Sequence, residues 1–473
     1  MSAIPGIGEP PASGRLDGGD HARAPVRQNG TDVDGRISMR ISVIGCGYLG
    51  AVHASAMAEL GHEVIGIDVD ERKIAALASG RPSFFEPGLP EILTSATATG
   101  RLRFSTEIAD AADAQVHFLA VGTPQTAGSS AADISHVDAA FGALLPHLAE
   151  GALVVGKSTV PVGTAQRLAA RLAEEAPHAS LAWNPEFLRE GFAVKDTLEP
   201  DRLVYGIAAG DGHAASVLDQ IYRAAIEAGT PRIVTDYATA ELVKVAANAF
   251  LATKISFINA MSEIADATGA DVTALADAIG HDARIGRRFL NAGVGFGGGC
   301  LPKDIRAFTA RAEELGHGDA LTFLREVDAI NLRQRQRVVD LAVAALGGSV
   351  HRKKVAVLGV TFKPDSDDVR DSPALDVAVL LKGLGADVVA TDPEGVANAR
   401  ARHPQLDYTT SMREALHGAD LVLLLTEWRE YRALDPVAAG RLVAGRRIID
   451  GRNVLDPVAF REAGWEYRGL GRP

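Results

Sequence analysis

The sequence predicts an α/β protein in which two doubly wound sheet domains flank a helical middle section. Three observations carry this prediction. A buried strand pattern at residues 40–44 runs into a glycine-rich turn and a helix, and a second strand and helix pattern begins at Lys353. Between them, residues 237–268 form one long helical pattern without proline. The predicted divisions are residues 1–38, 39–236, 237–348 and 349–473.

Composition argues against several classes of protein. The 473 residues suffice for two or three domains with sizeable cores. A net charge of −12 without a basic block argues against a nucleic-acid partner. Two cysteines argue against a disulfide framework and for a reducing compartment, so we expect a cytoplasmic protein. No apolar run approaches the ~20 residues of a membrane helix, and no signal-peptide core stands near the start.

The first 38 residues differ from the rest. They are rich in Gly, Pro, Asp and Arg and show no periodicity, so we expect a disordered leader. A targeting peptide fits less well, because acidic residues are frequent and no amphipathic stretch occurs. Met39 directly precedes the first strand, and translation from Met39 stays open beside translation from Met1.

The first strand leads into the pattern of a dinucleotide-binding turn. Gly45-Cys-Gly-Tyr-Leu-Gly50 stands between this strand and a helix that ends near Leu60, and the next strand ends at Asp68. In that context Gly45 makes the tight turn, Gly47 admits a pyrophosphate, and Gly50 lets the helix pack on the sheet. Asp68 suits ribose hydroxyls and would repel a 2′-phosphate. The sequence therefore predicts a Rossmann domain that binds NAD.

Two further residues of this unit have ordinary explanations. Lys73 could suggest NADP, but we expect Asp68 to dominate. Cys46 fills a free position of the turn and is interpreted as a structural thiol.

Further strands are predicted at residues 116–121, 152–155, 181–183, 202–207 and 231–234, after a loop at residues 82–89 and its helix. Ligands of such sheets bind at the carboxyl ends of the strands. Three ends are polar or rich in glycine: Gly122-Thr-Pro124, Lys157–Gly163 and Asn184–Gly191. Each alone is more typical of a turn, but together they would line one crevice.

The long helix from Tyr237 carries Lys244 and Asn248 at i,i+4 spacing, so both project from one face. Small and aromatic neighbours make this stripe a packed one, and a buried lysine that supplies charge to a reaction centre is the functional interpretation. After a short helix, the stretch Asp282–Gly293 contains three arginines that could form a basic patch for an anionic ligand.

A further long helix is predicted from about Asp319 to Leu346. Arg333, Arg335 and Arg337 fall on its polar positions and are interpreted as a solvated face. We expect the helical middle to link the two sheet domains and to form the contact between subunits.

The C-terminal pattern has the architecture of a nucleotide binder without a pyrophosphate turn. A strand at residues 355–359, a helix at 373–384 and a strand that ends at Asp392 are followed by strands at 421–425 and 447–449. The loop Thr361–Arg370 is not GxGxxG. We therefore expect a different nucleotide here, held through Phe362, Lys363 and Arg452.

The stretch Gly295–Asp304 holds the second cysteine, Cys300, after a run of glycines that would let the backbone approach a ligand closely. A helix is predicted to begin near Pro302, which would place Cys300 at a helix N-terminus and favour its thiolate, with Lys303 adding charge. An inert buried thiol is the alternative.

These motifs together resemble the UDP-glucose/GDP-mannose dehydrogenase family from Met39 to the C-terminus. The resemblance lies in GCGYLG, VGTP, KSTVPVG, NPEFLREG, ELVKVAANAF, GFGGGCLPKD, TFKPDSDDVRDSP and DGRN, in this order. It implies an NAD-binding Rossmann domain, a central long-helix dimerisation domain and a Rossmann-like domain for the sugar nucleotide. It also implies a homodimer or higher homo-oligomer that oxidises a sugar-nucleotide primary alcohol to the acid with two NAD⁺, as in polysaccharide biosynthesis.

The resemblance assigns roles to matching residues. Cys300 would form a thiohemiacetal and then a thioester, Lys244 and Asn248 would stabilise the oxyanion, and water and protons would be handled by Asp304, Thr159 and Glu186. Glu190 would touch both substrate and cofactor. Expected substrate contacts are Glu186, Phe187, Leu188, Arg189, Glu190, Lys244, Asn248, Phe289, Leu290, Asn291, Ala292, Gly293, Gly297, Lys363, Arg452 and, across the dimer, Arg284. Expected cofactor contacts besides the turn and Asp68 are Val52, Lys73, Thr123, Thr159, Glu190, Lys303 and Arg370, and no metal is expected.

Two other functions remain as alternatives. A single-step β-hydroxyacid dehydrogenase shares the fold plan but needs neither the cysteine loop nor a second nucleotide domain, and a non-enzymatic NAD-binding protein would not need the reactive residues. Within the family, residues 85–89 and 157–163 favour UDP-glucose, whereas GDP-mannose or another sugar nucleotide is the alternative substrate.

Overall fold

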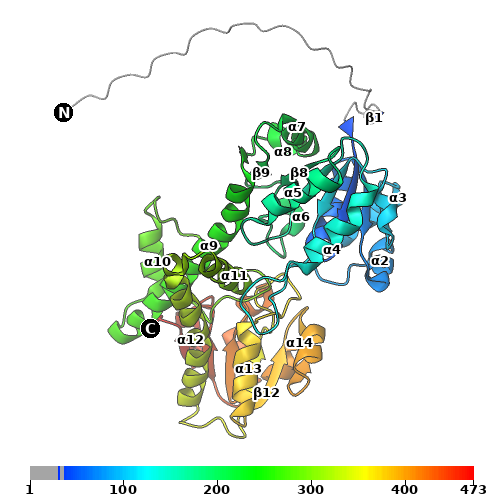
Figure 1. Ribbon diagram of the computed structural model, residues 1–473. Helices are drawn as coiled ribbons and strands as arrows, with labels where there is room; N and C mark the ends of the chain where they lie inside the picture. The colour runs from blue at the N-terminus through cyan, green and yellow to red at the C-terminus, as the bar shows by residue number, and fades with distance from the viewer. Residues whose placement is uncertain (1–29, 32–36) are drawn as a thin grey trace, which may run out of the picture.

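A computed structural model describes residues 30–31 and 37–473. The predicted disordered leader, residues 1–38, lies almost wholly outside the described residues. Of that stretch only β1 (Gly30–Thr31) and β2 (Ile37–Ser38) are described, and they pair as antiparallel strands. The rest of the described chain forms two sheet domains with helices between them (Figure 1).

The first sheet has eight strands in the order β10-β9-β8-β7-β6-β3-β4-β5. Strands β3 to β8 are parallel, and β9 runs antiparallel to β8. The strands are β3 (Arg40–Ile44), β4 (Glu63–Ile67), β5 (Leu102–Ser105), β6 (Val116–Leu119), β7 (Leu153–Gly156), β8 (Ser180–Trp183), β9 (Leu203–Ile207) and β10 (Arg232–Thr235). The helices are α1 (Tyr48–Glu59), α2 (Glu71–Ala78), α3 (Leu89–Ala98), α4 (Ser135–Leu144), α5 (Thr164–Glu175), α6 (Ala193–Leu198), α7 (Gly212–Ile221) and α8 (Arg223–Glu227).

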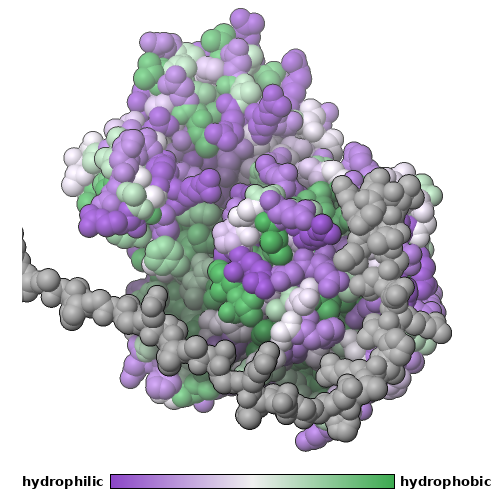
Figure 2. Space-filling model, turned by 90° about the horizontal axis from the view of Figure 1, so that it is seen from above, coloured by the Kyte–Doolittle hydropathy of each residue, from purple (hydrophilic) through white to green (hydrophobic). Residues whose placement is uncertain are grey.

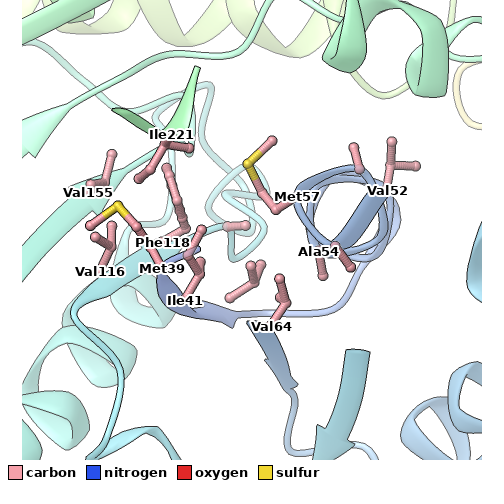
Figure 3. Close-up of a cluster of buried hydrophobic side chains, with 14 of the residues drawn as sticks. Met39, Ile41, Val52, Ala54, Met57, Val64, Val116, Phe118, Val155 and Ile221 are labelled. Atoms are coloured by element: carbon pink, nitrogen blue, oxygen red, sulfur yellow. The ribbon is translucent and has the colours of Figure 1, made fainter. Parts of the chain in front are cut away.

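Apolar side chains from β3, β6 and β7 pack against α1 and form the core of this domain. Figure 3 shows Ile41, Val116, Phe118 and Val155 on one side of the cluster and Met57 of α1 on the other. Because parallel strands covered on both faces bury nearly every side chain, they appear in the sequence as continuous apolar runs. This is why the central strands were predicted to within two residues.

Four helices lie between the two sheets: α9 (Tyr237–Thr268), α10 (Val272–Gly280), α11 (Leu301–Glu314) and α12 (Thr322–Ala345). The side chain of Asp236 caps α9 by accepting a hydrogen bond from Thr239 N, and Gly269 ends it in the left-handed conformation. Helix α9 runs from the first domain toward the second and packs on α11 and α12 (Figure 1). It therefore carries residues from the edge of one sheet to the neighbourhood of the other.

The second sheet is parallel, in the order β13-β12-β11-β14-β15-β16. Its strands are β11 (Lys354–Leu358), β12 (Asp387–Thr391), β13 (Asp407–Thr409), β14 (Leu421–Leu424), β15 (Arg447–Asp450) and β16 (Glu466–Gly469). Its helices are α13 (Pro373–Gly383), α14 (Val396–Arg402), α15 (Met412–Leu416), α16 (Arg429–Arg432), α17 (Pro436–Ala439) and α18 (Pro457–Glu462). The α/β class and the two sheet domains are as predicted.

The prediction of a solvated face on α12 is wrong for Arg335. This side chain is buried, and its guanidinium pairs with Asp371 at 2.9 Å and also with Asp376. Both acids lie at the start of α13, so the arginine ties the helical middle to the second sheet domain. A buried charge needs such partners, since an unpaired one is costly.

The surface seen from above mixes hydrophilic and hydrophobic residues (Figure 2). None of the helices in the described part of the chain is both long and apolar enough to cross a membrane.

Candidate active site

The turn after β3 has the geometry of a pyrophosphate cradle. Helix α1 begins at Tyr48, so the free N–H groups of its first turn face the loop Gly45–Gly47. A Cβ at Gly47 would meet no described atom within 4 Å, whereas one at Gly50 would lie 1.8 Å from the carbonyl oxygen of Gly45. The turn is therefore open where a phosphate would enter and tightly packed where the helix meets the sheet.

Asp68 stands beside this turn and is only partly buried. Its Oδ2 accepts a hydrogen bond from the backbone N–H of Cys46 at 2.8 Å and from Lys73 Nζ at 2.8 Å. Lys73, which could have bound a 2′-phosphate, is thus paired with Asp68, and its charge is partly neutralised. The open turn and the partly exposed carboxylate fit the pyrophosphate and ribose hydroxyls of NAD. Cys46 is buried, and burial raises its pKa to about 12, as a structural thiol requires.

Cys300 is the N-cap residue of α11, at the helix N-terminus that the sequence predicted. The residue is exposed to solvent, yet the protein around its sulfur raises the thiol pKa to about 12. Desolvation is the main cause, and the charge of Lys244 opposes it, whereas the charges of Glu186 and Asp304 add to it. In these surroundings desolvation outweighs the stabilisation of the thiolate that the helix start and Lys303 were expected to give.

Lys244 and Asn248 project from α9 into a buried polar network, as their spacing predicts. Lys244 Nζ lies 2.9 Å from Glu186 Oε1, and Asn248 Nδ2 donates to Asp304 Oδ2 at 2.7 Å. The second oxygen of Asp304 accepts from Lys303 Nζ at 2.7 Å. Burial acts to lower the pKa of Lys244, but nearby negative groups, Glu186 first, raise it overall. A permanent cation therefore stands at the centre of this network.

Glu190 connects the first domain to the second. Its Oε1 accepts from Arg370 at 3.2 Å, and Lys363 Nζ donates to its carbonyl oxygen. Burial, reinforced by the nearby charge of Asp368, raises the pKa of Glu190 to about 7. The loop after β8 thus meets the loop after β11, although the two are about 180 positions apart in the chain.

The glycines before Cys300 are required by packing within the protein. A Cβ at Gly297 would lie 2.2 Å from the carbonyl oxygen of Asp371, and one at Gly299 would lie 2.4 Å from Arg370 Cζ. The sequence suggested that these glycines let a ligand approach. In this structure the second sheet domain itself makes the close approach, and this packing fixes the loop that presents Cys300.

The stretch before this loop holds the predicted substrate residues Phe289, Leu290, Asn291, Ala292 and Gly293. Phe289 adopts a left-handed conformation with φ of 67°, which is strained for a residue with a side chain. The backbone N–H of Gly293 donates to Asn259 Oδ1 at 2.8 Å, and Asn453 Nδ2 donates to the carbonyl oxygen of Ala292. Both polar side chains hold the backbone of this stretch in place.

The predicted basic patch is weaker than the sequence suggested. Arg284 forms an ion pair with Asp282 at 2.6 Å, and Arg287 pairs with Asp277. Two of the three arginines are thus partly neutralised by acids of the same segment. Arg284 is exposed and remains a predicted substrate contact for a neighbouring subunit.

Other predicted residues lie in varied surroundings. Arg452 donates to three backbone carbonyl oxygens, of Leu425, Gly295 and Phe362, so it braces loops of the second domain. Val52 is fully buried in the core of the first domain. The hydroxyl of Thr123 donates to the carbonyl oxygen of Thr159 at 2.8 Å and joins two strand-end loops. In the loop after β8, Phe187 lies under the guanidinium of Arg202, Arg189 pairs with Asp196, and Leu188 N donates to Glu186 Oε2.

Two buried acids that hold the site were not predicted. Glu86 accepts hydrogen bonds from the backbone N–H groups of Gly191 and Ala193 and from the hydroxyl of Tyr48. Glu241 accepts from the backbone N–H groups of Gly163 and Ala165. Their only sequence signal is an acid in an apolar setting, on a loop for Glu86 and one turn before Lys244 for Glu241. Within the described residues no group of His, Cys, Asp or Glu side chains could hold a metal ion.

Comparison with known proteins decides the family. Three family models match the chain: the NAD binding, central and UDP binding domains of the UDP-glucose/GDP-mannose dehydrogenase family, over residues 39–226, 238–333 and 356–457. The chain belongs to this family. It is an NAD-dependent dehydrogenase, and the match to the NAD binding domain covers the residues of the glycine turn and Asp68.

Individual relatives agree with this assignment to the family. A UDP-glucose 6-dehydrogenase of Rhizobium meliloti is 41% identical over 92% of this chain and 100% of its own. The structure of a UDP-glucose dehydrogenase from Pyrobaculum islandicum is 40% identical, with a TM-score of 0.85, over 94% of this chain and 100% of its own. A GDP-mannose dehydrogenase from Pseudomonas aeruginosa is 30% identical, with a TM-score of 0.50, over 91% of this chain and 100% of its own.

Proposed function

We propose that this dehydrogenase oxidises UDP-glucose to UDP-glucuronate with two NAD⁺ per product, through a covalent intermediate on Cys300. The observation that carries the proposal is the convergence of Lys244, Asn248 and Asp304 around the cysteine loop. A one-step alcohol dehydrogenase needs no cysteine there. Greater likeness to UDP-glucose enzymes than to the GDP-mannose enzyme supports the choice of sugar nucleotide.

The residues have complementary roles in this scheme. NAD⁺ supplies the oxidant and accepts one hydride in each of the two oxidations. Once an aldehyde stands at C6, the Cys300 sulfur bonds to C6, the second C=O bond opens onto the oxygen, and the thiol proton ends on that oxygen in the thiohemiacetal. Lys244 and Asn248 donate hydrogen bonds to the oxygen while it carries charge.

Hydrolysis then completes the scheme. After the second oxidation, water attacks the thioester carbon, the bond to sulfur breaks, and the acid and the free thiol result. Glu186 and Asp304 are carboxylates near Cys300 and are proposed to take the proton of that water, with Thr159 assisting in water placement.

The raised pKa of Cys300 is compatible with this order of events. A protonated thiol is protected from oxidation, because the thiolate is the reactive form. Lys244 already acts to lower that pKa. In this scheme, a shift of Lys244 away from Glu186 toward the substrate oxygen and sulfur would favour the thiolate when it is needed.

A product assay tests the proposal. The chain should release two NADH per UDP-glucose and should oxidise GDP-mannose more slowly by orders of magnitude, since a pocket that pairs with uracil leaves polar groups unpaired with guanine. Cys300→Ser should bind both ligands but make no sustained acid. One NADH per turnover, or normal acid production by Cys300→Ser, would contradict the covalent scheme, whereas a preference for GDP-mannose would overturn only the substrate.

We further propose a homodimer formed along α9, in the cytoplasm. Leu242, Phe250, Phe257 and Ile264 are exposed on this helix, and the last three are spaced by seven residues, which places them on one stripe. Phe250 exposes 67% of its surface, an unusual cost for a phenyl ring in water unless another protein covers it. Both cysteines are free thiols, as a reducing compartment allows. A dimeric mass in light scattering that becomes monomeric in Phe250→Glu would support the interface.

A further inference from the structure

Lys157 is a buried cation to which the scheme above gives no role. It follows β7, and its Nζ lies 2.9 Å from Asn184 Oδ1 and 3.1 Å from the hydroxyl oxygen of Tyr222. Both partners are neutral, and in the described part of the chain no carboxylate lies within ion-pair distance of it. Burial lowers the pKa of Lys157 to about 7. An ammonium group in such a place is costly, so its presence calls for a compensating interaction.

Part of the compensation comes from the rings of Phe118 and Tyr222, since Lys157 Nζ lies 5.7 and 5.6 Å from their centroids, and a cavity beside Lys157 adds polar surroundings. Its volume is about 50 Å³, enough for ordered water, and it is lined by Lys157, His53, Tyr222 and Glu186 among others. Both ring nitrogens of His53 are buried without a partner among the described residues, so the cavity has polar groups to offer to water. The charge of Glu186 acts to raise the pKa of Lys157. The charges of Lys157 and Glu186 therefore interact across this small polar cavity.

Two lysines thus act on Glu186. Its Oε1 pairs with Lys244 at 2.9 Å, and its Oε2 accepts a hydrogen bond from Leu188 N at 2.8 Å. Lys157 lines the same cavity as Glu186 and is held by Asn184, which is two residues before Glu186 in the same loop. Asn184 is itself fixed to the sheet, because its Nδ2 donates to the carbonyl oxygen of Val204.

We propose that Lys157 is a positioning residue that supplies the counter-charge to Glu186 while Lys244 serves the substrate oxygen. The proposal rests on the proposed function, in which Lys244 donates to the oxygen that gains charge at C6. When Lys244 turns toward that oxygen, its ion pair with Glu186 weakens, and a buried carboxylate without a counter-charge is strongly disfavoured. Lys157 stays bonded to Asn184 and Tyr222 while Lys244 moves, so its positive charge continues to act on Glu186.

Lys157→Met tests this role, because methionine removes the charge and keeps much of the apolar stem. We expect kcat to fall about tenfold or more, since the loss appears when Lys244 leaves Glu186. The KM values for UDP-glucose and NAD⁺ should stay within about threefold, since the resting ion pair of Lys244 and Glu186 is untouched. A purely structural defect would instead lower the melting temperature and change KM and kcat together.

Tyr222→Phe is the matched control. It removes a hydroxyl that donates to Asn184 Oδ1 at 2.8 Å and accepts from Lys157 Nζ at 3.1 Å, and so loosens the same loop while Lys157 keeps its amine and its bond to Asn184. Its kcat should stay within about twofold of the wild-type value. Equal losses in Lys157→Met and Tyr222→Phe would overturn the proposal in favour of a mechanical clamp, and so would a wild-type kcat in Lys157→Met.

Lys157→Gln is a second uncharged variant that can still donate to Asn184, and we expect it to behave as Lys157→Met does. If neither variant folds, Lys157 acts in folding and the proposal is overturned. The wild-type chain is assayed first: failure to release two NADH per UDP-glucose would refute the proposed function, whereas the inference fails only on the comparison of variants with an active wild type.

Discussion

The two strand–turn–helix units of this chain each contain a turn that begins in the same way, but the turn has a different role in each unit. The first joins β3 to α1 and β4, and the second joins β11 to α13 and β12. In both, the first residue of the turn is a glycine in the left-handed region, Gly45 with φ of 91° and Gly359 with φ of 95°. Each donates its N–H over 2.8 Å to the carbonyl oxygen of the last residue of the second strand, Ile67 or Thr391. The two turns therefore begin alike, although α1 follows the first at Tyr48 and α13 follows the second only at Pro373.

In each unit, the acid that follows the second strand accepts a hydrogen bond from the backbone N–H of the second residue of the turn. Cys46 N donates to Asp68 Oδ2 at 2.8 Å, and Val360 N donates to Asp392 Oδ2 at 2.7 Å. Beyond this bond the two acids differ. Asp68 is partly exposed with Lys73 as its side-chain partner, whereas Asp392 is fully buried.

The third residue of each turn marks the difference. Gly47 leaves open space, but Thr361 stands in the same position of the second turn, and its hydroxyl donates to Asp392 Oδ2 at 3.1 Å. The indole N–H of Trp428 donates to the same oxygen at 3.1 Å. The Asp68 carboxylate keeps some exposed surface and has one side-chain partner, whereas the Asp392 carboxylate is bonded to side chains of its own domain. One βαβ framework thus serves either recognition or internal bracing, and side chains at the turn decide between them.

The strongest test of this contrast is the stability of two matched variants. Asp392→Asn keeps the size of the side chain but turns an amide toward N–H and O–H donors, which leaves several of them unpaired in the core. We expect it to lower the free energy of unfolding by about 3 kcal/mol or more. Asp68→Asn should lower it by less than about 1 kcal/mol, because water can reach that site. Denaturant titration of both variants checks this, and equal losses would show that the two acids are braced alike.

Cofactor preference gives the next largest effect. NAD⁺ should exceed NADP⁺ in kcat/KM by about a hundredfold, or roughly 2.7 kcal/mol, since Asp68 would face the 2′-phosphate. Asp68→Asn should reduce that ratio to about tenfold or less. Lys73→Met is the control: it removes the partner of Asp68 and should keep the preference for NAD⁺. Equal use of both cofactors by the wild type would mean that Asp68 does not face the ribose.

Gly47→Thr would convert the first turn toward the second. No described atom lies within 4 Å of the new Cβ, so the variant should fold with an unchanged melting temperature. A threonine side chain in the open turn should obstruct the pyrophosphate and weaken NAD⁺ binding at least tenfold, or about 1.4 kcal/mol. Binding of UDP-glucose to the same variant, measured by calorimetry, should not change. Retained affinity for NAD⁺ would place the cofactor elsewhere.

Local patterns predicted most of this comparison and missed its decisive contact. Gly45, Gly47 and Asp68 fulfil requirements of a single turn, so spacing alone exposes them. Asp392 also ends a strand and resembles a second ribose-binding acid. Asp392 is instead bonded within the protein by Trp428. This residue lies 36 residues further along the chain and reaches Asp392 only through the packing of the sheet.

The strands that the sequence did not reveal have a common cause. β5, β13 and β16 all lie at the edges of the two sheets. An edge strand is covered less than a central one, so its residues include polar ones and the continuous apolar run is absent. Long-range packing has the opposite effect on Arg335, which is buried although its helix pattern is polar.

The candidate site shows the same limit. Spacing placed Lys244 and Asn248 on one face of α9, and the glycine stretch placed Cys300 at a helix start, because both depend on neighbours in the chain. The pKa of Cys300 depends instead on desolvation first and then on the charges of Lys244, Glu186 and Asp304, and a sequence does not show what will surround a thiol.

The smallest expected effect concerns the place where the two units meet. Glu190 pairs with Arg370 from the second turn, and burial raises its pKa from an ordinary 4.5 to about 7. Between these values the folded chain holds a proton that the unfolded chain has released. Its stabilising contribution is therefore complete below pH 4.5 and is lost as the pH rises through 7. From pH 6 to 8 this contribution should fall by about 1 kcal/mol, measured as the difference between the wild type and Glu190→Gln in how the free energy of unfolding changes with pH.

Glu190→Gln should remove this pH dependence, because glutamine stays neutral and can keep bonds to the second domain. Glu241 needs its own control, since burial raises its pKa to about 7 as well, while backbone N–H groups of residues 163–165 lower it. Glu241→Gln should remove a similar share of the fall, and the double variant should instead gain stability from pH 6 to 8, because burial lowers the pKa of Lys157 to about 7 and that group contributes the opposite trend. The two variants separate the contributions: Glu241 lies within the first domain and its junction with α9, whereas Glu190 acts across the contact with Arg370. An unchanged slope in Glu190→Gln would mean that its carboxylate is already ionised at pH 6, held by Arg370 and Lys363, and that the two units meet through a lasting ion pair.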